Sequence, residues 1–449
     1  MLNSVYMNLP RSLQNAAMTA YGWKMYRQRF GGEVPGPYNR IESVFETIKT
    51  DLLAQQAKRF ALLVSHVAKT VPYYQSLFKQ LGITPQDVNL INMADFFPVI
   101  KKQDILSQPK QFITTDARCL KGAFLLNTSG SSGTPMQVIS SLEARRINYF
   151  FYQLALSEYG LHYRSRSTTF AGRVLYKGGS NQPARIDRFN NTQYLSSYQV
   201  SDDSIEIYIR ELNRWQPEFI DSYPSVLREL ASLASARGLK LEFRPKILLT
   251  SSESLTDSSR QKIEAFFGAA IMDHYGCTEM AVSAFYRDGQ YHVHPLYSFV
   301  ELEPLAAGSY SLLATGLVNF AMPLIRYSIG DSVVTDNPSN AYLFQAIEGR
   351  IDDLVVTPEG RKIGRLDPAF KGVEGILLAQ VVQHAVDRLE IKVVLSKGSS
   401  PLFDEVRLAN NFRELTSSCM KIEISYHDDI ERGANGKFKS VVSLLDGAS

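Results

Sequence analysis

Apolar side chains recur every three or four positions near the start of the chain, which is the spacing of an amphipathic helix. The pattern is clearest over residues 15–30 and 41–67. Proline interrupts it in Val71-Pro72-Tyr73-Tyr74 and again at Pro98. Proline lacks the backbone donor that a helix interior needs, so these sites separate helices. We therefore expect a mostly helical front end over about residues 1–110.

The pattern changes between about residues 120 and 345, where short apolar runs alternate with amphipathic stretches. Such alternation is typical of an α/β body with a largely parallel sheet. Turn-rich sequence from about 289 to 345 indicates a β-rich subdomain that follows it. The expected strands are 168–171, 219–221, 246–250, 270–274 and 311–314, and the expected helices are 204–215, 225–237 and 257–267.

A smaller unit ends the chain. Its pattern predicts strands at 389–395 and 421–426, with a helix at 402–415 between them. This is a compact α+β module of ordinary domain size. We expect an α/β protein with two domains. The first is a large, multi-layer N-terminal domain over residues 1–351, and the second is a small, mobile C-terminal domain over residues 352–449.

Composition narrows the possible partners and the compartment. Lys and Arg number 48 against 45 Asp and Glu, a formal net charge of +3, which argues against nucleic acid or a membrane surface as the main partner. The three cysteines, Cys119, Cys277 and Cys419, are odd in number and far apart, which favours a reducing compartment. No apolar run has transmembrane length and no secretory signal is evident, so we expect a cytoplasmic protein.

Three polar loops are expected directly after strands. They are residues 127–135, 251–254 and 275–279. Ligands of open α/β sheets bind beyond the carboxyl ends of the strands. If these loops share one edge of the sheet, their side chains converge on a pocket.

The loop 127–135 reads Asn-Thr-Ser-Gly-Ser-Ser-Gly-Thr-Pro. Small hydroxyl side chains and backbone N–H groups can surround an anion such as a phosphate. A flexible surface linker has the same composition, so the loop alone leaves both interpretations open. It is not the common phosphate loop, because no lysine follows its second glycine.

Five short motifs follow one another along nearly the whole chain. They are a Ser/Thr/Gly loop at 128–135, Tyr-Gly-x-Thr-Glu at 275–279, Arg-Tyr-x-x-Gly-Asp at 326–331, Gly-Arg-x-Asp-Asp at 349–353 and Gly-Lys at 436–437. Together they resemble the adenylate-forming ligases, and within them the branch related to phenylacetate–CoA ligase and the CapK-type proteins. Each motif alone is weak evidence, whereas five in the family's order are specific.

The resemblance implies an ATP-dependent, AMP-forming reaction. A carboxylic acid is converted to an acyl-adenylate, and the acyl group then passes to the thiol of coenzyme A or of carrier-protein phosphopantetheine. ATP and Mg²⁺ are the implied cofactors, together with coenzyme A or phosphopantetheine. The identity of the acid and the oligomeric state stay open.

The resemblance also implies roles for individual residues. It assigns Thr278 to the α-phosphate, Glu279 to Mg²⁺ and Asp331 to the ribose hydroxyls. Lys437 stabilises the charge that develops during adenylation, and Asp352 is the hinge of the small domain. The remaining nucleotide contacts are assigned to Ser129, Gly130, Ser131, Ser132, Gly133, Thr134, Ser252, Glu253, Ser254, His274, Tyr275, Gly276 and Arg350.

Each of these residues also has an ordinary structural explanation. The less favoured alternative for Tyr275 is a buried aromatic residue with its hydroxyl satisfied, and for Glu279 a surface carboxylate. For Asp331 it is a turn residue, and for Lys437 a solvated cation. His292 and His294 alternate on a possible strand, but this chain lacks the cysteine cluster of a structural zinc site, so we expect no zinc there.

Two other functions fit the same motifs. The protein could transfer AMP or the acyl group to a non-thiol acceptor, and the CapK resemblance makes a sugar acceptor in capsule or exopolysaccharide biosynthesis conceivable. It could also be a non-catalytic nucleotide-binding protein on the same scaffold. Two departures from the family motifs speak for this last alternative. Met136 stands where a lysine is expected, and Ser251 and Ser252 stand where the family has Gly-Ala or Gly-Gly.

Overall fold

The computed structural model describes residues 6–31, 52–128, 136–176, 182–306, 308–350, 355–363, 366–370, 372–373, 375–395, 403–432 and 438–445. The chain forms two compact units. Unit 1 comprises Met1–Trp23, Tyr163–Asp273 and Glu348–Ser449, and unit 2 comprises Lys24–His162 and His274–Ile347. Helix α2 (Arg11–Phe30) begins in unit 1 and ends in unit 2.

The first part of unit 1 is an α/β layer. Its strands stand in the order β8-β7-β6-β3-β5-β4. The pairs β7/β6, β6/β3 and β3/β5 are parallel, and only the terminal pair β5/β4 is antiparallel. The strands are β3 (Ser167–Ala171), β4 (Arg185–Asp187), β5 (Thr192–Ser196), β6 (Phe219–Ser222), β7 (Ile247–Ser251) and β8 (Ile271–Gly276), which runs on into unit 2.

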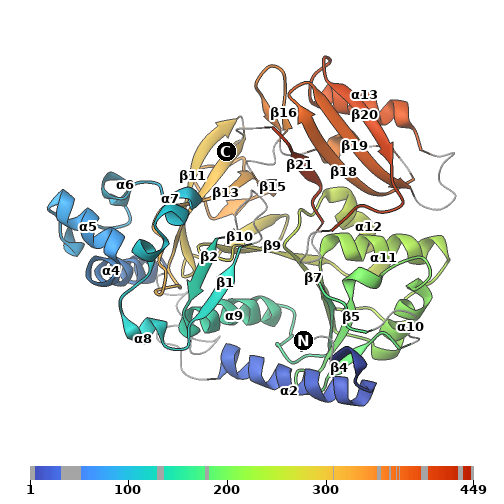
Figure 1. Ribbon diagram of the computed structural model, residues 1–449, viewed down its shortest axis with the longest axis horizontal. Coiled ribbons are helices and arrows are strands. Elements are labelled where there is room, and N and C mark those ends of the chain that lie inside the picture. Colours follow the sequence, from blue (N-terminus) through green and yellow to red (C-terminus); the bar gives the residue numbers. More distant parts are fainter. Residues whose placement is uncertain are drawn as a thin grey trace. The chain divides into compact units, whose positions relative to one another are not determined.

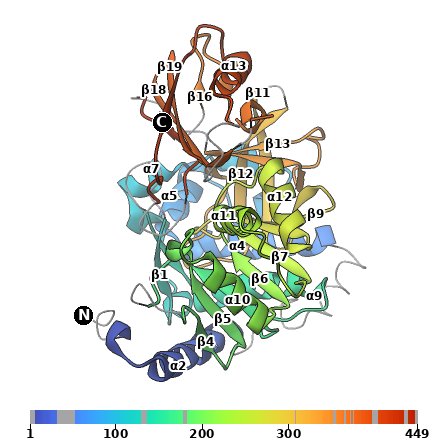
Figure 2. The ribbon, with the colours of Figure 1, turned by 90° about the vertical axis from the view of Figure 1, so that its right-hand side faces the viewer.

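Helices cover this parallel sheet, as Figures 1 and 2 show. They are α10 (Ile205–Trp215), α11 (Pro224–Ala236) and α12 (Asp257–Phe267). Their fully buried leucines pack against Ile220 and Leu248 of the strands in one apolar cluster. Helix α12 has clear signals at both ends. The Thr256 side chain accepts the Ser259 N–H, and Gly268 adopts a left-handed φ of 65° at the C-cap.

The second part of unit 1 is a small α+β module, drawn in orange to red in Figure 1. Its sheet has the order β20-β19-β18-β21, with β19/β18 antiparallel and the outer pairs parallel. Leu408 and Phe412 of its helix are fully buried in the same cluster as Leu389, Ile391 and Val393. The elements are β16 (Val355–Val356), β17 (Lys362–Ile363), η6 (Asp367–Phe370), β18 (Ile376–Ala385), β19 (Arg388–Leu395), α13 (Glu405–Leu415), β20 (Lys421–Tyr426) and β21 (Val441–Ser443).

Unit 2 begins with short helices around one apolar cluster. Phe60, Leu63 and Val64 face that cluster from α4, and Tyr74 from α5. The helices are α4 (Leu52–Thr70), α5 (Pro72–Leu81), η2 (Pro85–Asp87), α6 (Met93–Phe96), α7 (Lys102–Ser107), η3 (Pro109–Phe112), α8 (Ala117–Leu120) and α9 (Leu142–Ser157). Pro72 begins α5 at the position where its missing N–H costs nothing.

The strands of unit 2 are antiparallel. β14, β10, β9 and the end of β8 are neighbours in that order, and β11, β12 and β13 form a separate sheet. β1 and β2 form a hairpin on either side of the Ser/Gly loop. The strands are β1 (Phe124–Asn127), β2 (Gln137–Ser140), β9 (Ser283–Arg287), β10 (Gln290–Val293), β11 (Ser298–Ala306), β12 (Ser309–Gly316), β13 (Tyr327–Val334), β14 (Leu343–Phe344) and β15 (Ala346–Arg350), on which the chain passes into unit 1.

The predicted fold class is confirmed, with differences at element ends. The helix expected at 257–267 has those bounds, and the strand expected at 270–274 continues to Gly276. Tyr275 and Gly276 therefore lie in a strand and not in the loop that the sequence suggested. Within the described ranges, no helix combines the length and the apolar character needed to cross a bilayer.

Candidate active site

Two motif segments meet in unit 2 through a pair of hydrogen bonds. Tyr275, at the end of β8, donates from its hydroxyl to Asp331 Oδ2 at 2.6 Å. Tyr327, at the start of β13, donates from its hydroxyl to Glu279 Oε1 at 2.9 Å. Each segment thus supplies one tyrosine donor and one carboxylate acceptor. The structure brings together the segments 275–279 and 326–331, which are about fifty positions apart in sequence.

Both carboxylates are nearly buried. Asp331 is 7% exposed and Glu279 is 8% exposed. A buried carboxylate is costly unless its oxygens accept hydrogen bonds or bind a cation. A carboxylate offers about four acceptor positions, and one tyrosine hydroxyl occupies one of them. The pair is therefore suited to accept further donors, or to ligate a cation, without leaving its position.

Close backbone packing shapes the turn that carries Glu279. Met280 has a left-handed φ of 58°. A Cβ added to Gly316, at the end of β12, would lie 2.8 Å from the Met280 carbonyl oxygen and 3.0 Å from the Ala281 Cα. Only a glycine permits this approach, and nothing in the sequence around Gly316 indicates it. Gly316 therefore helps to set the position of the Glu279 turn.

Arg326 fixes the start of β13. It has a left-handed φ of 52°, and its Nε lies 3.0 Å and 3.2 Å from the two oxygens of Glu301. Its Nη1 donates to the Phe97 carbonyl oxygen at 2.9 Å. Burial raises the pKa of Glu301, and the guanidinium opposes that rise. Arg326 thus braces the strand that carries Asp331, and no sequence motif indicates its partner Glu301.

His274 is engaged in packing. Its Nε2 lies 3.0 Å from the Ser283 hydroxyl, and its ring stacks on Phe285 with centroids 4.6 Å apart. Burial lowers the pKa of His274 to about 4, so the ring is neutral near pH 7. A Cβ added to Gly276 would lie 3.3 Å from this ring, so the glycine leaves room for it. Thr278 is partly buried and directly precedes Glu279.

The serine-rich segment after β7 lies in unit 1, near the Gly-Arg motif. Ser252 is exposed and has a left-handed φ of 72°. A Cβ added to Gly349 would lie 3.9 Å from Ser254 Oγ. Gly349 itself has a φ of 113°, which side chains rarely tolerate. The structure therefore brings the segment 252–254 close to the start of the motif 349–353.

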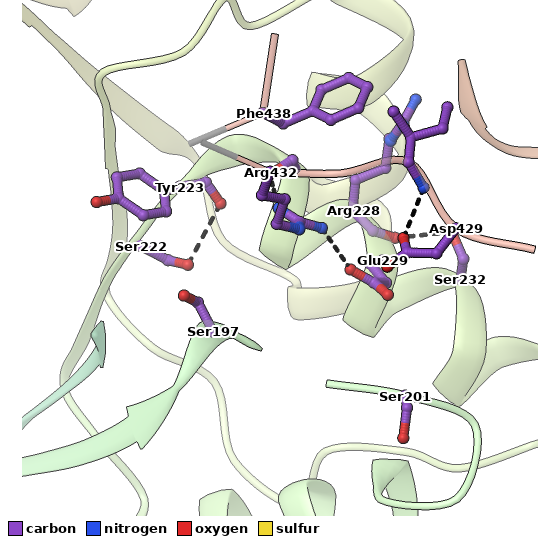
Figure 3. Close-up of polar contacts among 12 residues, drawn as sticks. Ser197, Ser201, Ser222, Tyr223, Arg228, Glu229, Ser232, Asp429, Arg432 and Phe438 are labelled. Carbon is purple, nitrogen blue, oxygen red and sulfur yellow. Dashed lines mark hydrogen bonds and ion pairs between the residues drawn. The ribbon is translucent and has the colours of Figure 1, made fainter. Parts of the chain in front are cut away.

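Glu253, between these serines, binds groups of its own chain. Its carboxylate accepts the Ser225 N–H at 3.0 Å, the Ser225 hydroxyl at 3.1 Å and the Phe438 N–H at 2.6 Å. Burial raises the pKa of Glu253, and the hydrogen bonds oppose that rise. The expectation from sequence was that this residue lies beside a nucleotide base. The contacts seen here join α11 to the end of the chain, and Figure 3 shows their surroundings.

Several predicted site residues lie outside the described residues. They are Ser129, Gly130, Ser131, Ser132, Gly133, Thr134, Asp352 and Lys437. Arg350 is described only by its backbone, as the last residue of β15. The roles expected of these residues stay predictions.

Among the residues that the structure describes, three metal-capable side chains gather at His66, Asp116 and Cys119. Asp116 is already paired with Arg118 at 2.8 Å, and His66 Nε2 donates to the Phe320 carbonyl oxygen at 2.9 Å. These contacts account for the cluster without an ion. His294, one of the two histidines that alternate in the sequence, packs against Phe151 with ring centroids 4.8 Å apart.

Comparisons with known proteins agree with the motifs. Residues 355–444 match the family model of the CapK C-terminal domain. The chain is 25% identical over 410 residues to Protein CapK of Staphylococcus aureus, covering 88% of this chain and 89% of that protein. It is 24% identical to the phenylacetate-coenzyme A ligase of Thermus thermophilus, with 89% of this chain and 98% of that protein covered.

The fold is similar to that of 2-hydroxyisobutyryl-CoA ligase in its postadenylation state. The TM-score is 0.65 at 17% sequence identity, and the match covers 88% of this chain and 90% of that chain. These findings confirm the resemblance to the CapK and phenylacetate–CoA ligase branch, and they confirm the mixed α/β fold.

The packing of His274 makes the stability of the protein depend on pH. The pKa of His274 is about 4 in the folded protein and near 6.5 in an unfolded chain, so its stabilising contribution is complete above pH 6.5. Between pH 6.5 and 4 the unfolded chain takes up a proton that the folded state does not, and the free energy of unfolding falls. Over this pH range we expect the free energy of unfolding to fall by about 2 kcal/mol less in His274→Gln than in the natural protein.

Urea denaturation at pH 7.0 and pH 4.5 measures the effect. The exposed His162 provides the matched control, and His162→Gln is expected to retain the pH dependence of the natural protein. Burial also lowers the pKa of His294, to about 4, and the pKa values of His66 and His292, so these residues contribute to the loss that remains in the His274 variant. If the free energy of unfolding falls between pH 7.0 and pH 4.5 by the same amount in His274→Gln as in the natural protein, this account is contradicted.

Proposed function

We propose that the protein is an AMP-forming acid–thiol ligase. It uses ATP and Mg²⁺ to activate a carboxylic acid as an acyl-adenylate, and it transfers the acyl group to the thiol of coenzyme A or of carrier-protein phosphopantetheine. The observation that carries the proposal is the pairing of the two motif segments in unit 2, Tyr275 with Asp331 and Tyr327 with Glu279. The similarity to phenylacetate–CoA ligases supports the same class of reaction.

The chemistry explains why two buried carboxylates are useful. A carboxylic acid is a poor acyl donor until one of its oxygens attacks the α-phosphorus of ATP and displaces pyrophosphate. A thiol then attacks the carbonyl carbon and displaces AMP. Both steps need groups that hold the nucleotide in place, neutralise phosphate charge and keep water from the anhydride.

Asp331 holds the ribose. Its carboxylate accepts both ribose hydroxyls while Tyr275 donates to Oδ2 and keeps the group oriented. The same hydrogen bond fixes the Tyr275 ring, whose face then supports the adenine. His274 and Gly276 complete this end of β8 behind the tyrosine.

Glu279 is the residue that would hold Mg²⁺. Its one carboxylate fits this ion, because Mg²⁺ is usually bound by one or two carboxylates and keeps waters and phosphate oxygens as its other ligands. The Tyr327 hydroxyl donates to Oε1 and holds the carboxylate in one orientation. When bound, the ion neutralises charge on the triphosphate. The neighbouring Thr278 donates its hydroxyl to the α-phosphate.

Other roles rest on the motifs alone. The loop Ser129, Gly130, Ser131, Ser132, Gly133 and Thr134 surrounds the β- and γ-phosphates, and Arg350 contacts the ribose or a phosphate. Lys437 stabilises the attacking carboxylate and the α-phosphate. Ser252 and Ser254 flank the adenine. We also propose a division into domains 1–351 and 352–449 with a hinge at Asp352, which agrees with the family match that begins at residue 355.

The similarity to Protein CapK favours one alternative. The acceptor of AMP or of the acyl group could be a hydroxyl or an amine in place of a thiol. Thiol dependence distinguishes the two reactions, because only an acid–thiol ligase requires coenzyme A or a carrier protein for product release.

ATP–pyrophosphate exchange tests the proposal directly. We expect exchange with at least one acid in a panel of aryl, fatty and hydroxy acids, and consumption of that acid only when coenzyme A or a loaded carrier protein is added. Exchange followed by turnover without any thiol would establish the alternative acceptor. No exchange, combined with no ATP binding by calorimetry, would refute both.

Asp331→Ala is expected to weaken ATP binding by about 100-fold, because it removes two hydrogen bonds to a charged acceptor, each worth roughly 1.5 kcal/mol. Isothermal titration with a non-hydrolysable ATP analogue measures the loss. Asp336→Ala is the matched control, since Asp336 is exposed and follows β13 in the same unit. Equal affinity in the two variants would remove Asp331 from the nucleotide site.

Lys437→Ala is expected to lower the rate of ATP–pyrophosphate exchange by about 100- to 1,000-fold, the usual effect of removing one charge stabiliser from a transition state. ATP affinity is expected to stay nearly unchanged. Lys439, two positions later, is the control for local charge, and Lys439→Ala should retain exchange. A normal rate in the Lys437 variant would rule out its assignment.

A further inference from the structure

One continuous chain of hydrogen bonds in unit 1 joins the end of the protein to the α/β layer. Arg432 binds Glu229 Oε2 through Nη2 at 2.7 Å and donates from Nη1 to the Ser225 hydroxyl at 2.7 Å. Ser225 donates from its hydroxyl to Glu253, and the Phe438 N–H donates to the same carboxylate. Figure 3 shows Arg432 reaching Glu229, with Phe438 beside it. We call these five residues the latch.

The charged members of the latch are shielded from water. The side chains of Arg432 and Glu229 are 11% and 14% exposed. Removing one partner of a buried ion pair leaves the other charge uncompensated, which destabilises the arrangement strongly. The Ser225 hydroxyl has one proton, which it donates to Glu253, and it accepts from Arg432. Every member therefore depends on its neighbour, and the latch is expected to form or break as a whole.

The same segment of chain also belongs to the small module. Ile430 is 4% exposed and packs with Leu378 of β18 and Val394 of β19, and the Phe438 ring packs against this cluster. Apolar contacts therefore fix residues 430 and 438 to the module, while their polar neighbours bind α11 and the loop after β7. The latch thus connects the module to the α/β layer through hydrogen bonds.

We propose that the latch selects the pose of the module that serves adenylation, with Arg432 and Glu253 as positioning residues. The inference rests on the proposed function, which assigns Lys437 to that half-reaction. Phe438 is the residue that follows Lys437, and its N–H is held by the loop 252–254, which is proposed to flank the adenine. The second half-reaction does not use Lys437, so we expect it not to depend on the latch.

Two half-reactions measured separately test the positioning role. Arg432→Met is expected to lower ATP–pyrophosphate exchange by at least about tenfold, since it removes the buried partner of Glu229. Thioester formation from supplied acyl-adenylate and coenzyme A is expected to change by less than about threefold. A merely structural role would lower both rates by the same factor and would lower the melting temperature with them. That result would overturn the proposal.

Two further variants serve as controls. Arg237 also binds two acids, Asp202 and Glu206, but it has no contact with the latch residues. Arg237→Met is expected to leave the ratio of the two rates unchanged. The double variant Arg432→Gln and Glu229→Gln removes both members of this ion pair together, so we expect less loss of stability than in Arg432→Met. If the ratio of the two rates shifts as much in Arg237→Met as in Arg432→Met, Arg432 has no specific role.

Hydrogen exchange tests the latch without any assay of activity. In Glu253→Gln and in Arg432→Met, peptides covering residues 438–445 are expected to exchange at least about tenfold faster than in the natural protein. Unchanged protection would overturn the latch even in an active ligase. Faster exchange in a protein that activates no acid would refute the proposed function and leave the latch in place. Faster exchange with an unchanged rate ratio would overturn the positioning role.

Discussion

The candidate site depends on two tyrosine–carboxylate hydrogen bonds across β8 and β13. Two carboxylates at 7% and 8% exposure would lose hydration energy without compensation if they had no hydrogen-bond donors. Each is held instead by a tyrosine from the opposite segment, so neither segment can shift without unpairing a buried group on the other. The two hydrogen bonds therefore hold the two motif segments in one rigid arrangement. Rigid placement is what a nucleotide site needs, since binding energy is lost when groups must be ordered first.

The carboxylates of the two units differ in what they do. Asp331 and Glu279 each accept the hydroxyl of a tyrosine from the other motif segment. Glu253 accepts three donors from elements of its own unit. A buried carboxylate can therefore join two motif segments or join elements far apart in the sequence.

The sequence predicted what depends on local patterns. Helix α12 was located correctly because Thr256 and Gly268 mark its ends, and an amphipathic stretch lies between them. The end of β8 was not located correctly. Tyr275-Gly276 has the sequence of a turn, but pairing with Ala284 and Ser283 extends the strand through both residues. The contact of Glu253 with Phe438 joins positions 185 residues apart, and no periodicity in the sequence predicts such a contact. The motifs predicted that the segments of Asp331 and Glu279 lie together, and the structure joins them by two hydrogen bonds, whereas the contacts of Glu301 and Gly316 arise from tertiary packing alone.

The left-handed backbone at Met280 and Arg326 has a consequence for engineering. Non-glycine residues in this conformation cost on the order of 1–3 kcal/mol each, and here Met280 directly follows Glu279 while Arg326 directly precedes Tyr327, the donor to Glu279. Glycine at either position would relieve that energy, but it would remove the buried Met280 side chain or the contacts of Arg326 with Glu301 and Phe97. It would also give the backbone new conformations at the point where the carboxylates are aimed. Glycine at these two positions would thus loosen the alignment of the two candidate-site carboxylates without a net gain in stability, so a search for more stable variants should begin elsewhere in the chain.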